Sequence, residues 1–138
     1  MKIIIINGPN LNLIGKREVE IYGEMDFNDY LKFIRSKYKN LKIDYFQSNI
    51  EGEIINKIHE SNIDCDVILI NAGGYSHYSV AILDALKCSK IKKIEVHISN
   101  IYSREEFRSK SILSSACDSV ICGFGLKSYE LAIKSLSI

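Results

Sequence analysis

A chain of 138 residues, 46% hydrophobic and 25% charged, is long enough to bury the core of one domain without metal or disulfide support. Its formal net charge of +1 excludes the strongly basic composition typical of proteins that bind nucleic acids or acidic membrane surfaces. The first apolar run is too short for a signal peptide and no segment has the apolar length of a transmembrane helix, so we expect a cytoplasmic protein with one domain, residues 1–138.

Short apolar runs with the character of buried strands recur along the chain. They occupy residues 2–6, 41–46, 67–70, 93–98 and 119–122. Helical periodicity fills the intervals. One helix is expected after a cap at Asp26, one around Ile54 and Ile58, one from Val80, a short one in 104–108 and a last one over 128–136. Strands that alternate with helices predict an α/β fold, a flavodoxin-like three-layer sandwich with a five-stranded parallel sheet of order 2-1-3-4-5, buried on both faces.

The cysteines show no spacing typical of a zinc site. They are Cys65, Cys88, Cys117 and Cys122, and none belongs to a C-x-x-C pair. Each lies in or beside an apolar segment, where a free cysteine usually behaves as a small core residue. We therefore expect reduced cysteines, a reducing compartment and no metal.

Polar residues gather after the predicted strands, which is where ligands bind in an open α/β sheet. The third strand is followed by Asn71, Tyr75, Ser76 and His77, and the fourth by Ser99, Asn100, Arg104 and Arg108. Glu95 and His97 alternate within the fourth strand, so their side chains share one face. A lone histidine at a strand end is often only a satisfied polar residue. A carboxylate inside a buried strand, however, needs a partner, and a carboxylate that orients an imidazole makes a general acid.

The connection over residues 7–23 is long and polar, as functional loops in small domains usually are. Within it, Arg17 would favour the phenolate of Tyr22, which makes that tyrosine a candidate base. Asn10 is a candidate to hold a water or an oxygen that becomes negative in a transition state. His59 lies in the middle of a predicted helix and is interpreted as structural.

Two glycine clusters suggest a weaker alternative. Gly73-Gly74 and Gly123-x-Gly125 follow strands and could approach phosphates, but neither completes a dinucleotide-binding fingerprint and no P-loop pattern occurs. A metal site is weaker still, because the histidines lack ligand spacing.

Five long stretches carry a resemblance to a known family. They read IINGPNLNLIGKREVEIYG, FQSNIEGEIINKIHE, NAGGYSHYSVAILDAL, EVHISNIYSREEFR and ICGFGLKSYELAI. In this order and over nearly the whole chain they resemble the type II 3-dehydroquinate dehydratases. The resemblance implies removal of water from 3-dehydroquinate to give 3-dehydroshikimate through an enolate, without cofactor or metal, in the shikimate or the quinate pathway.

The resemblance also implies residue roles. Tyr22 would remove the C2 proton, and Arg17 would keep its phenolate available. Asn10 would hold the water that supports the enolate. His97 would protonate the departing C1 hydroxyl, and Glu95 would be its partner.

Substrate recognition maps onto further positions in the same way. The residues that match the family's hydroxyl- and carboxylate-binding positions are Asn71, His77, Arg108 and the Ile98-Ser99 segment. Asp84 matches an acid that a neighbouring subunit supplies, and the family is typically a dodecamer built as a tetramer of trimers.

The chain departs from the family pattern in places. Val19 stands where proline is usual, and Ala72, Gly74 and Tyr78 also differ, but every chemical role remains filled. A related lyase or isomerase with the same tyrosine and histidine is the alternative enzyme. A flavodoxin-like binding module for a small molecule or nucleotide is the non-enzymatic one.

Overall fold

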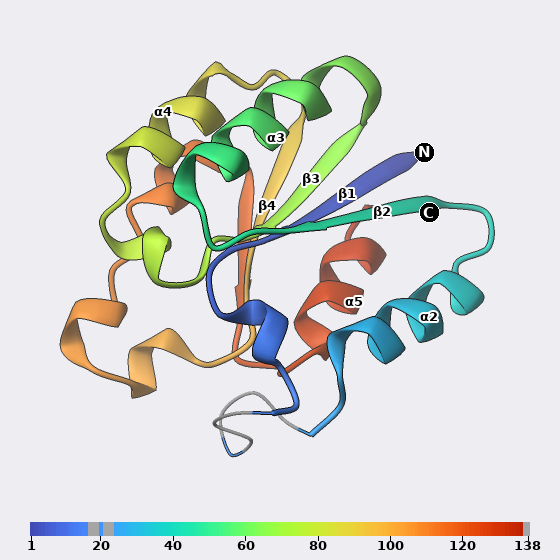
Figure 1. Ribbon diagram of the computed structural model, residues 1–138, viewed down its shortest axis with the longest axis horizontal. Coiled ribbons are helices and arrows are strands. Elements are labelled where there is room, and N and C mark those ends of the chain that lie inside the picture. The colour runs from blue at the N-terminus through green and yellow to red at the C-terminus, as the bar shows by residue number, and fades with distance from the viewer. Residues whose placement is uncertain (17–19, 21–23, 137–138) are drawn as a thin grey trace.

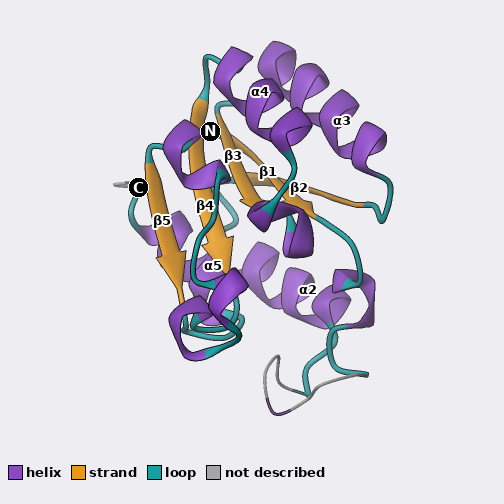
Figure 2. Ribbon diagram, turned by 90° about the vertical axis from the view of Figure 1, so that its left-hand side faces the viewer, coloured by secondary structure: helices purple, strands orange, loops and turns teal. Residues whose placement is uncertain are grey.

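One five-stranded sheet lies between two layers of helices (Figures 1 and 2). The computed structural model describes residues 1–16, 20 and 24–136. The strands are β1 (Lys2–Asn7), β2 (Lys42–Gln47), β3 (Val67–Asn71), β4 (Lys92–His97) and β5 (Ser119–Cys122). Their order is β2-β1-β3-β4-β5, and every neighbouring pair is parallel. The predicted α/β class and the predicted strand order are confirmed.

Within the described ranges, two helices cover each face of the sheet. They are α2 (Phe27–Lys37), α3 (Glu51–Asp64), α4 (Val80–Cys88) and α5 (Lys127–Lys134). Figure 2 shows α3 and α4 on one face and α2 and α5 on the other. The alternation of side chains along β1 explains both cores: Ile3 and Ile5 pack with α2 and α5, whereas Ile4 and Ile6 pack with α3 and α4. The continuous isoleucine run thus serves two apolar layers at once.

Local signals set the helix starts. The side chain of Asp26 accepts a hydrogen bond of 2.7 Å from the backbone N–H of Asn28 and caps α2, as predicted. Ser79 caps α4 through the N–H of Ile82 at 3.0 Å. Such caps stabilise a helix by about 1 kcal/mol.

The connections contain short 3₁₀ helices that periodicity did not reveal. They are η1 (Leu11–Leu13), η2 (Gly73–His77), η3 (Ile101–Ser103), η4 (Glu106–Arg108) and η5 (Leu113–Ala116). The short helix expected in 104–108 is the 3₁₀ helix η4, which occupies only the last three of these residues. Among the described residues no helix is long and apolar enough to cross a membrane.

One burial prediction was wrong. The edge strands are not buried on both sides: β5 has no buried residue, and β2 has only Ile43. An edge strand has a neighbour on one side only, so its faces are less fully covered.

The prediction that the cysteines behave as core residues holds in part. Cys65 and Cys117 are half-buried and pack against the core beneath α3 and α4. Cys122 is also half-buried, whereas Cys88 is exposed at the last position of α4.

The loops after β1 and β3 meet backbone to backbone. The N–H of Gly8 donates a 2.7 Å hydrogen bond to the carbonyl of Asn71. A Cβ atom at Gly8 would lie 2.4 Å from the carbonyl oxygen of Ala72, so only glycine fits there. Because the connections leave β1 and β3 toward opposite sides, this contact lies at the reversal of strand order, where α/β proteins bind ligands.

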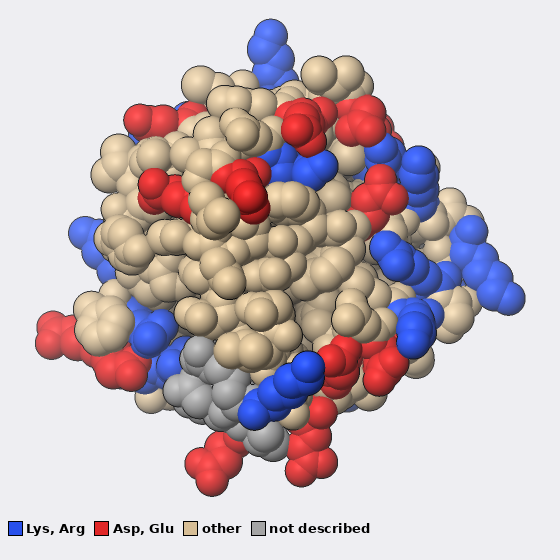
Figure 3. Space-filling view, in the orientation of Figure 1, with Lys and Arg blue, Asp and Glu red and all other residues tan. Residues whose placement is uncertain are grey.

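Charge is dispersed over the visible surface. Figure 3 shows lysine, arginine, aspartate and glutamate side chains of both signs around the rim of one face. The centre of that face, over the carboxyl-terminal ends of β1 and β2, is uncharged. No large single-sign patch occupies this face.

Candidate active site

A small cavity of about 40 Å³ opens at the carboxyl-terminal ends of β3 and β4. Its walls come from the loops after β1, β3 and β4. They are formed by Leu11, Asn71, Gly73, Gly74, His77, His97, Ile98, Ser99, Ile101, Arg104 and Arg108. The structure therefore brings together both strand-end histidines and all the predicted substrate-binding positions except Asp84.

Glu95 and His97 form a buried hydrogen-bonded pair at the end of β4. His97 Nε2 lies 2.8 Å from Glu95 Oε1, and the carboxylate is fully buried. An ionised carboxylate can only accept hydrogen bonds, so Nε2 carries a proton and donates it. Nδ1 of His97 then remains for a ligand, and this nitrogen has no hydrogen-bond partner among the described residues. The pair predicted from residue spacing is confirmed as a contact.

Two serine hydroxyls complete the surroundings of the carboxylate. Ser111 Oγ donates to Glu95 Oε1, and Ser114 Oγ donates to Oε2. Burial alone would raise the pKa of the Glu95 carboxyl, but the bond and charge of His97, together with both serines, hold it below its ordinary value of 4.5. Glu95 is thus held ionised, as an acceptor for the N–H of His97. Sequence reasoning missed both serines, which lie in and before the irregular η5.

His77 stands beside His97 with its ring orientation fixed by the backbone. The two ring centroids are 6.4 Å apart and the rings are inclined by 23°. His77 Nδ1 lies 2.9 Å from the carbonyl oxygen of Lys110. A carbonyl only accepts, so Nδ1 carries the proton, and in the neutral ring Nε2 is an acceptor for a ligand hydroxyl.

A buried polar chain supports Asn71 from below. Asn71 Nδ2 donates to the hydroxyl of Tyr129 at 3.0 Å, and that hydroxyl donates to Asn7 Oδ1 at 2.7 Å. Asn71 Oδ1 accepts from the N–H of Gly73 at 3.2 Å. The amide is thereby fixed while one N–H and one lone pair remain for a ligand. Tyr129 is fully buried, and desolvation raises its hydroxyl pKa, so it stays a neutral donor. Sequence reasoning also missed Tyr129.

The segment after β4 contributes groups suited to an anion. No backbone hydrogen bond within the described chain uses the N–H groups of Ile98 and Ser99. Arg104 Nη1 lies 3.5 Å from Ser99 Oγ, and Arg108 Nε donates to Glu105 Oε2 at 2.6 Å. Glu105 Oε2 also lies 3.9 Å from Arg104 Nε, so it neutralises part of the charge of both guanidinium groups. The two backbone N–H groups, which no bond within the described chain uses, can bind a carboxylate.

Other predicted residues do not line this cavity or lie outside the described residues. Asn10 is exposed, has a left-handed backbone (φ 68°) and donates its N–H to Asn49 Oδ1 at 3.0 Å. Asp84 is exposed on α4 and does not line the cavity. His59 is exposed on α3. Arg17, Val19 and Tyr22 lie outside the described residues. Over the described ranges, no three His, Cys, Asp or Glu side chains gather as metal ligands.

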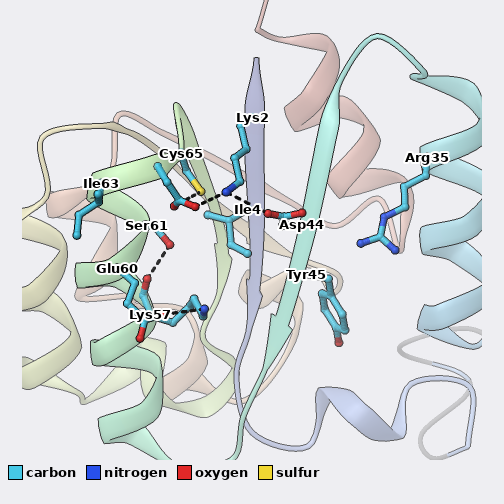
Figure 4. Close-up of a pocket in the computed structure, with 11 residues that line it drawn as sticks. Lys2, Ile4, Arg35, Asp44, Tyr45, Lys57, Glu60, Ser61, Ile63 and Cys65 are labelled. Atoms are coloured by element: carbon cyan, nitrogen blue, oxygen red, sulfur yellow. Dashed lines mark hydrogen bonds and ion pairs between the residues drawn. The ribbon is translucent and has the colours of Figure 1, made fainter.

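A larger hollow of about 570 Å³ begins at the amino-terminal end of β1 (Figure 4). Its charged groups are already paired with one another. Lys2 Nζ bonds Asp64 and lies 3.3 Å from Asp44, while Lys57 bonds Glu60 at 2.8 Å. Arg35 Nε donates to the carbonyl of Ile43 at 2.9 Å. Its greater volume does not make it the site, because these charges neutralise one another and the hollow lies at the strand edge opposite to His97.

Comparisons with known proteins identify the family of the chain. A family model described as dehydroquinase class II matches residues 1–137. A protein of Caldicellulosiruptor bescii named 3-dehydroquinate dehydratase is 54% identical over 98% of this chain and 95% of its own length.

Solved structures give the same result. The type II dehydroquinase of Butyrivibrio crossotus has a TM-score of 0.95 at 50% identity and covers 100% of this chain and 98% of its own. The enzyme of the same type from Propionibacterium acnes has a TM-score of 0.94 at 39% identity, over 99% of this chain and 95% of its own. The chain therefore belongs to the class II dehydroquinases, a family of enzymes, as its motifs predicted.

Proposed function

We propose that the protein removes water from 3-dehydroquinate to give 3-dehydroshikimate by an anti elimination through an enolate. The observation that carries the proposal is the buried Glu95–His97 pair, which opens onto a cavity with hydroxyl- and carboxylate-binding groups in a chain of this family. An elimination beside a ketone needs a base, support for the enolate oxygen and an acid for the leaving group.

The proposed roles follow the order of bond changes. Tyr22, as a phenolate kept available by Arg17, takes the C2 proton, and Asn10 holds the water that supports the enolate oxygen. The C1–C2 double bond then forms as the C1–O bond breaks. His97 delivers its proton to the departing hydroxyl, which leaves as water, while Glu95 stabilises the protonated imidazole. After one turnover Tyr22 has gained a proton and His97 has lost one. Proton exchange with solvent then restores the Tyr22 phenolate and the protonated His97.

Recognition of the substrate follows the wall of the cavity. Asn71, His77 and Arg108 bind hydroxyl groups, and Ile98 and Ser99 bind the carboxylate through N–H groups that no backbone bond uses. Asp84 reaches the site of a neighbouring subunit in a homododecamer, a tetramer of trimers. Its exposure on α4, outside its own cavity, agrees with that role. We place the enzyme in the shikimate pathway to the aromatic amino acids, in the cytoplasm, with residues 1–138 as one catalytic domain.

The test supplies 3-dehydroquinate and follows the ultraviolet absorbance of the conjugated product. Wild-type protein should convert 3-dehydroquinate to this product. The absence of an absorbance change with folded protein would contradict the proposal. Tyr22→Phe should abolish turnover but retain binding of a product-like ligand, whereas near-normal activity would assign the base elsewhere. Borohydride added with substrate should leave the enzyme active, because no lysine imine forms.

A further inference from the structure

The two site histidines are braced by one short segment that has no assigned role. Residues 110–114 follow η4 and include the first two residues of η5, and they contact both His77 and Glu95. The carbonyl of Lys110 holds His77 Nδ1 at 2.9 Å. Two residues further on, the N–H of Ile112 donates to the carbonyl of Ser76 at 2.9 Å. The segment is thus attached to the loop after β3.

The same segment is attached to β4 through the Glu95 carboxylate. Ser111 and Ser114 each donate to one of its oxygens. Ser111 Oγ also lies 3.3 Å from the carbonyl of Ser76, but a hydroxyl has one proton, and the closer, ionised carboxylate is the stronger acceptor. Leu113, between the serines, is fully buried in the core beneath α4 and fixes the segment in place.

We propose that residues 110–114 are a positioning element of the active site, in which the hydroxyls of Ser111 and Ser114 orient Glu95 and the carbonyl of Lys110 orients His77. This inference rests on the proposed function. A carboxylate with a single partner can rotate, whereas three donors on two oxygens fix its plane and hence the plane of the His97 ring. The two ring nitrogens left for a ligand, Nε2 of His77 and Nδ1 of His97, are then held at fixed positions beside the cavity, which lowers the cost of orientation when substrate binds.

The titratable groups that face Glu95 are few. Among the described residues they are His97 on β4 and the Cys117 thiol after η5. Burial, with the nearby Glu95 charge, raises the pKa of Cys117 to about 12, so this thiol stays protonated in the working range. A shift of the acid limb in a pH profile therefore reports the Glu95–His97 pair.

The experiment compares Ser111→Ala and Ser114→Ala with Ser115→Ala in the dehydroquinate assay. Ser115 is the matched control, because it is exposed and donates to the carbonyl of Ile112 at 3.1 Å, away from Glu95. Each test variant should lose about tenfold in kcat with little change in KM, since the acid is misplaced but the binding wall remains. Without a hydroxyl donor the pKa of Glu95 rises, so the acid limb of kcat should move to higher pH.

Rescue distinguishes positioning from a general loss of packing. Ser111→Thr keeps the donor and should retain the wild-type acid limb. If an alanine variant does not fold, Ser114→Cys supplies a weaker donor of similar volume and should give a kcat between the alanine range and wild type. Wild-type kcat and acid limb in Ser111→Ala, Ser114→Ala or Ser114→Cys would overturn the inference. Absence of turnover in the wild type would instead overturn the proposed function.

Discussion

Two carboxylates, each with a basic partner, lie at opposite ends of the parallel strands, and the two pairs differ in what surrounds them. Glu95 and His97, at the carboxyl-terminal edge, are buried, and Nδ1 of His97 faces a small cavity. Asp64 and Lys2, at the amino-terminal edge, line a hollow more than ten times larger, about 570 against 40 Å³. The first pair keeps hydrogen-bonding capacity for a ligand, whereas the second uses it internally. The site is therefore identified by buried polar groups with hydrogen-bonding capacity left for a ligand, and not by the volume of the cavity.

The largest expected effect is a difference in kcat between variants of the two carboxylates, Glu95 and Asp64. Glu95→Gln should lower kcat by about 10²-fold or more, because a neutral amide does not stabilise a protonated His97 and its NH₂ group faces other donors. Asp64→Asn is the matched control and should leave kcat unchanged. Steady-state kinetics with 3-dehydroquinate measures both. A Glu95→Gln enzyme as active as Asp64→Asn would show that the buried pair has no role in the chemistry.

The second prediction concerns stability beneath the site edge. Tyr129→Phe should lower the free energy of unfolding by about 1–3 kcal/mol, because Asn71 and Asn7 each lose a buried partner. Tyr30→Phe provides the control: its hydroxyl is buried without a hydrogen-bond partner in the described chain, so its removal should cost little. Urea denaturation of both variants measures the difference. Equal losses would mean that the Asn7–Tyr129–Asn71 chain does not stabilise the fold.

The sequence predicted those features of the fold and of the site that follow a regular period along the chain. Alternation placed Glu95 and His97 on one face of one strand, and apolar runs located five strands to within about one residue. Three strands end one residue later than predicted, at Asn7, Gln47 and Asn71, because the parallel backbone pairing continues past the apolar run into a polar residue. The long motifs predicted the family, which the comparisons confirm, while the residue roles that the family implies stay predictions.

The missing parts depend on contacts between distant, irregular segments. Ser111 and Ser114 follow a stretch of 3₁₀ turns without a period, and they meet Glu95 only because the chain folds back along β4. Tyr129 lies in the last predicted helix, and its partner Asn71 is 58 positions away, so no local pattern links the two. The burial of edge strands was overestimated because local hydrophobicity does not reveal which strands have a neighbour on one side only.

The smallest expected effect concerns salt. The contribution of the Asp64–Lys2 pair to stability should depend on salt concentration more than that of the Glu95–His97 pair. The pKa of Asp64 is lowered from 3.8 by its bond to Lys2, and that of Glu95 is held below 4.5 despite burial. In both cases the unfolded chain binds the proton at higher pH, so the stabilisation is present above the ordinary pKa and is lost as pH falls through the folded value.

Exposure then decides how salt acts on each contribution. The side chain of Asp64 is 58% exposed and that of Glu95 is fully buried. Raising the salt from about 0.1 M to about 1 M shortens the screening length from roughly 10 to 3 Å, which weakens the exposed pair and leaves the buried one nearly unchanged. Thermal unfolding of wild type and Asp64→Asn across the acid range at both salt concentrations measures this. The variant should lose only the salt-sensitive part of the acid limb. If the salt-insensitive part also disappeared, the acid stability assigned to Glu95 would belong to the exposed edge, and the contrast between the two edges would fail.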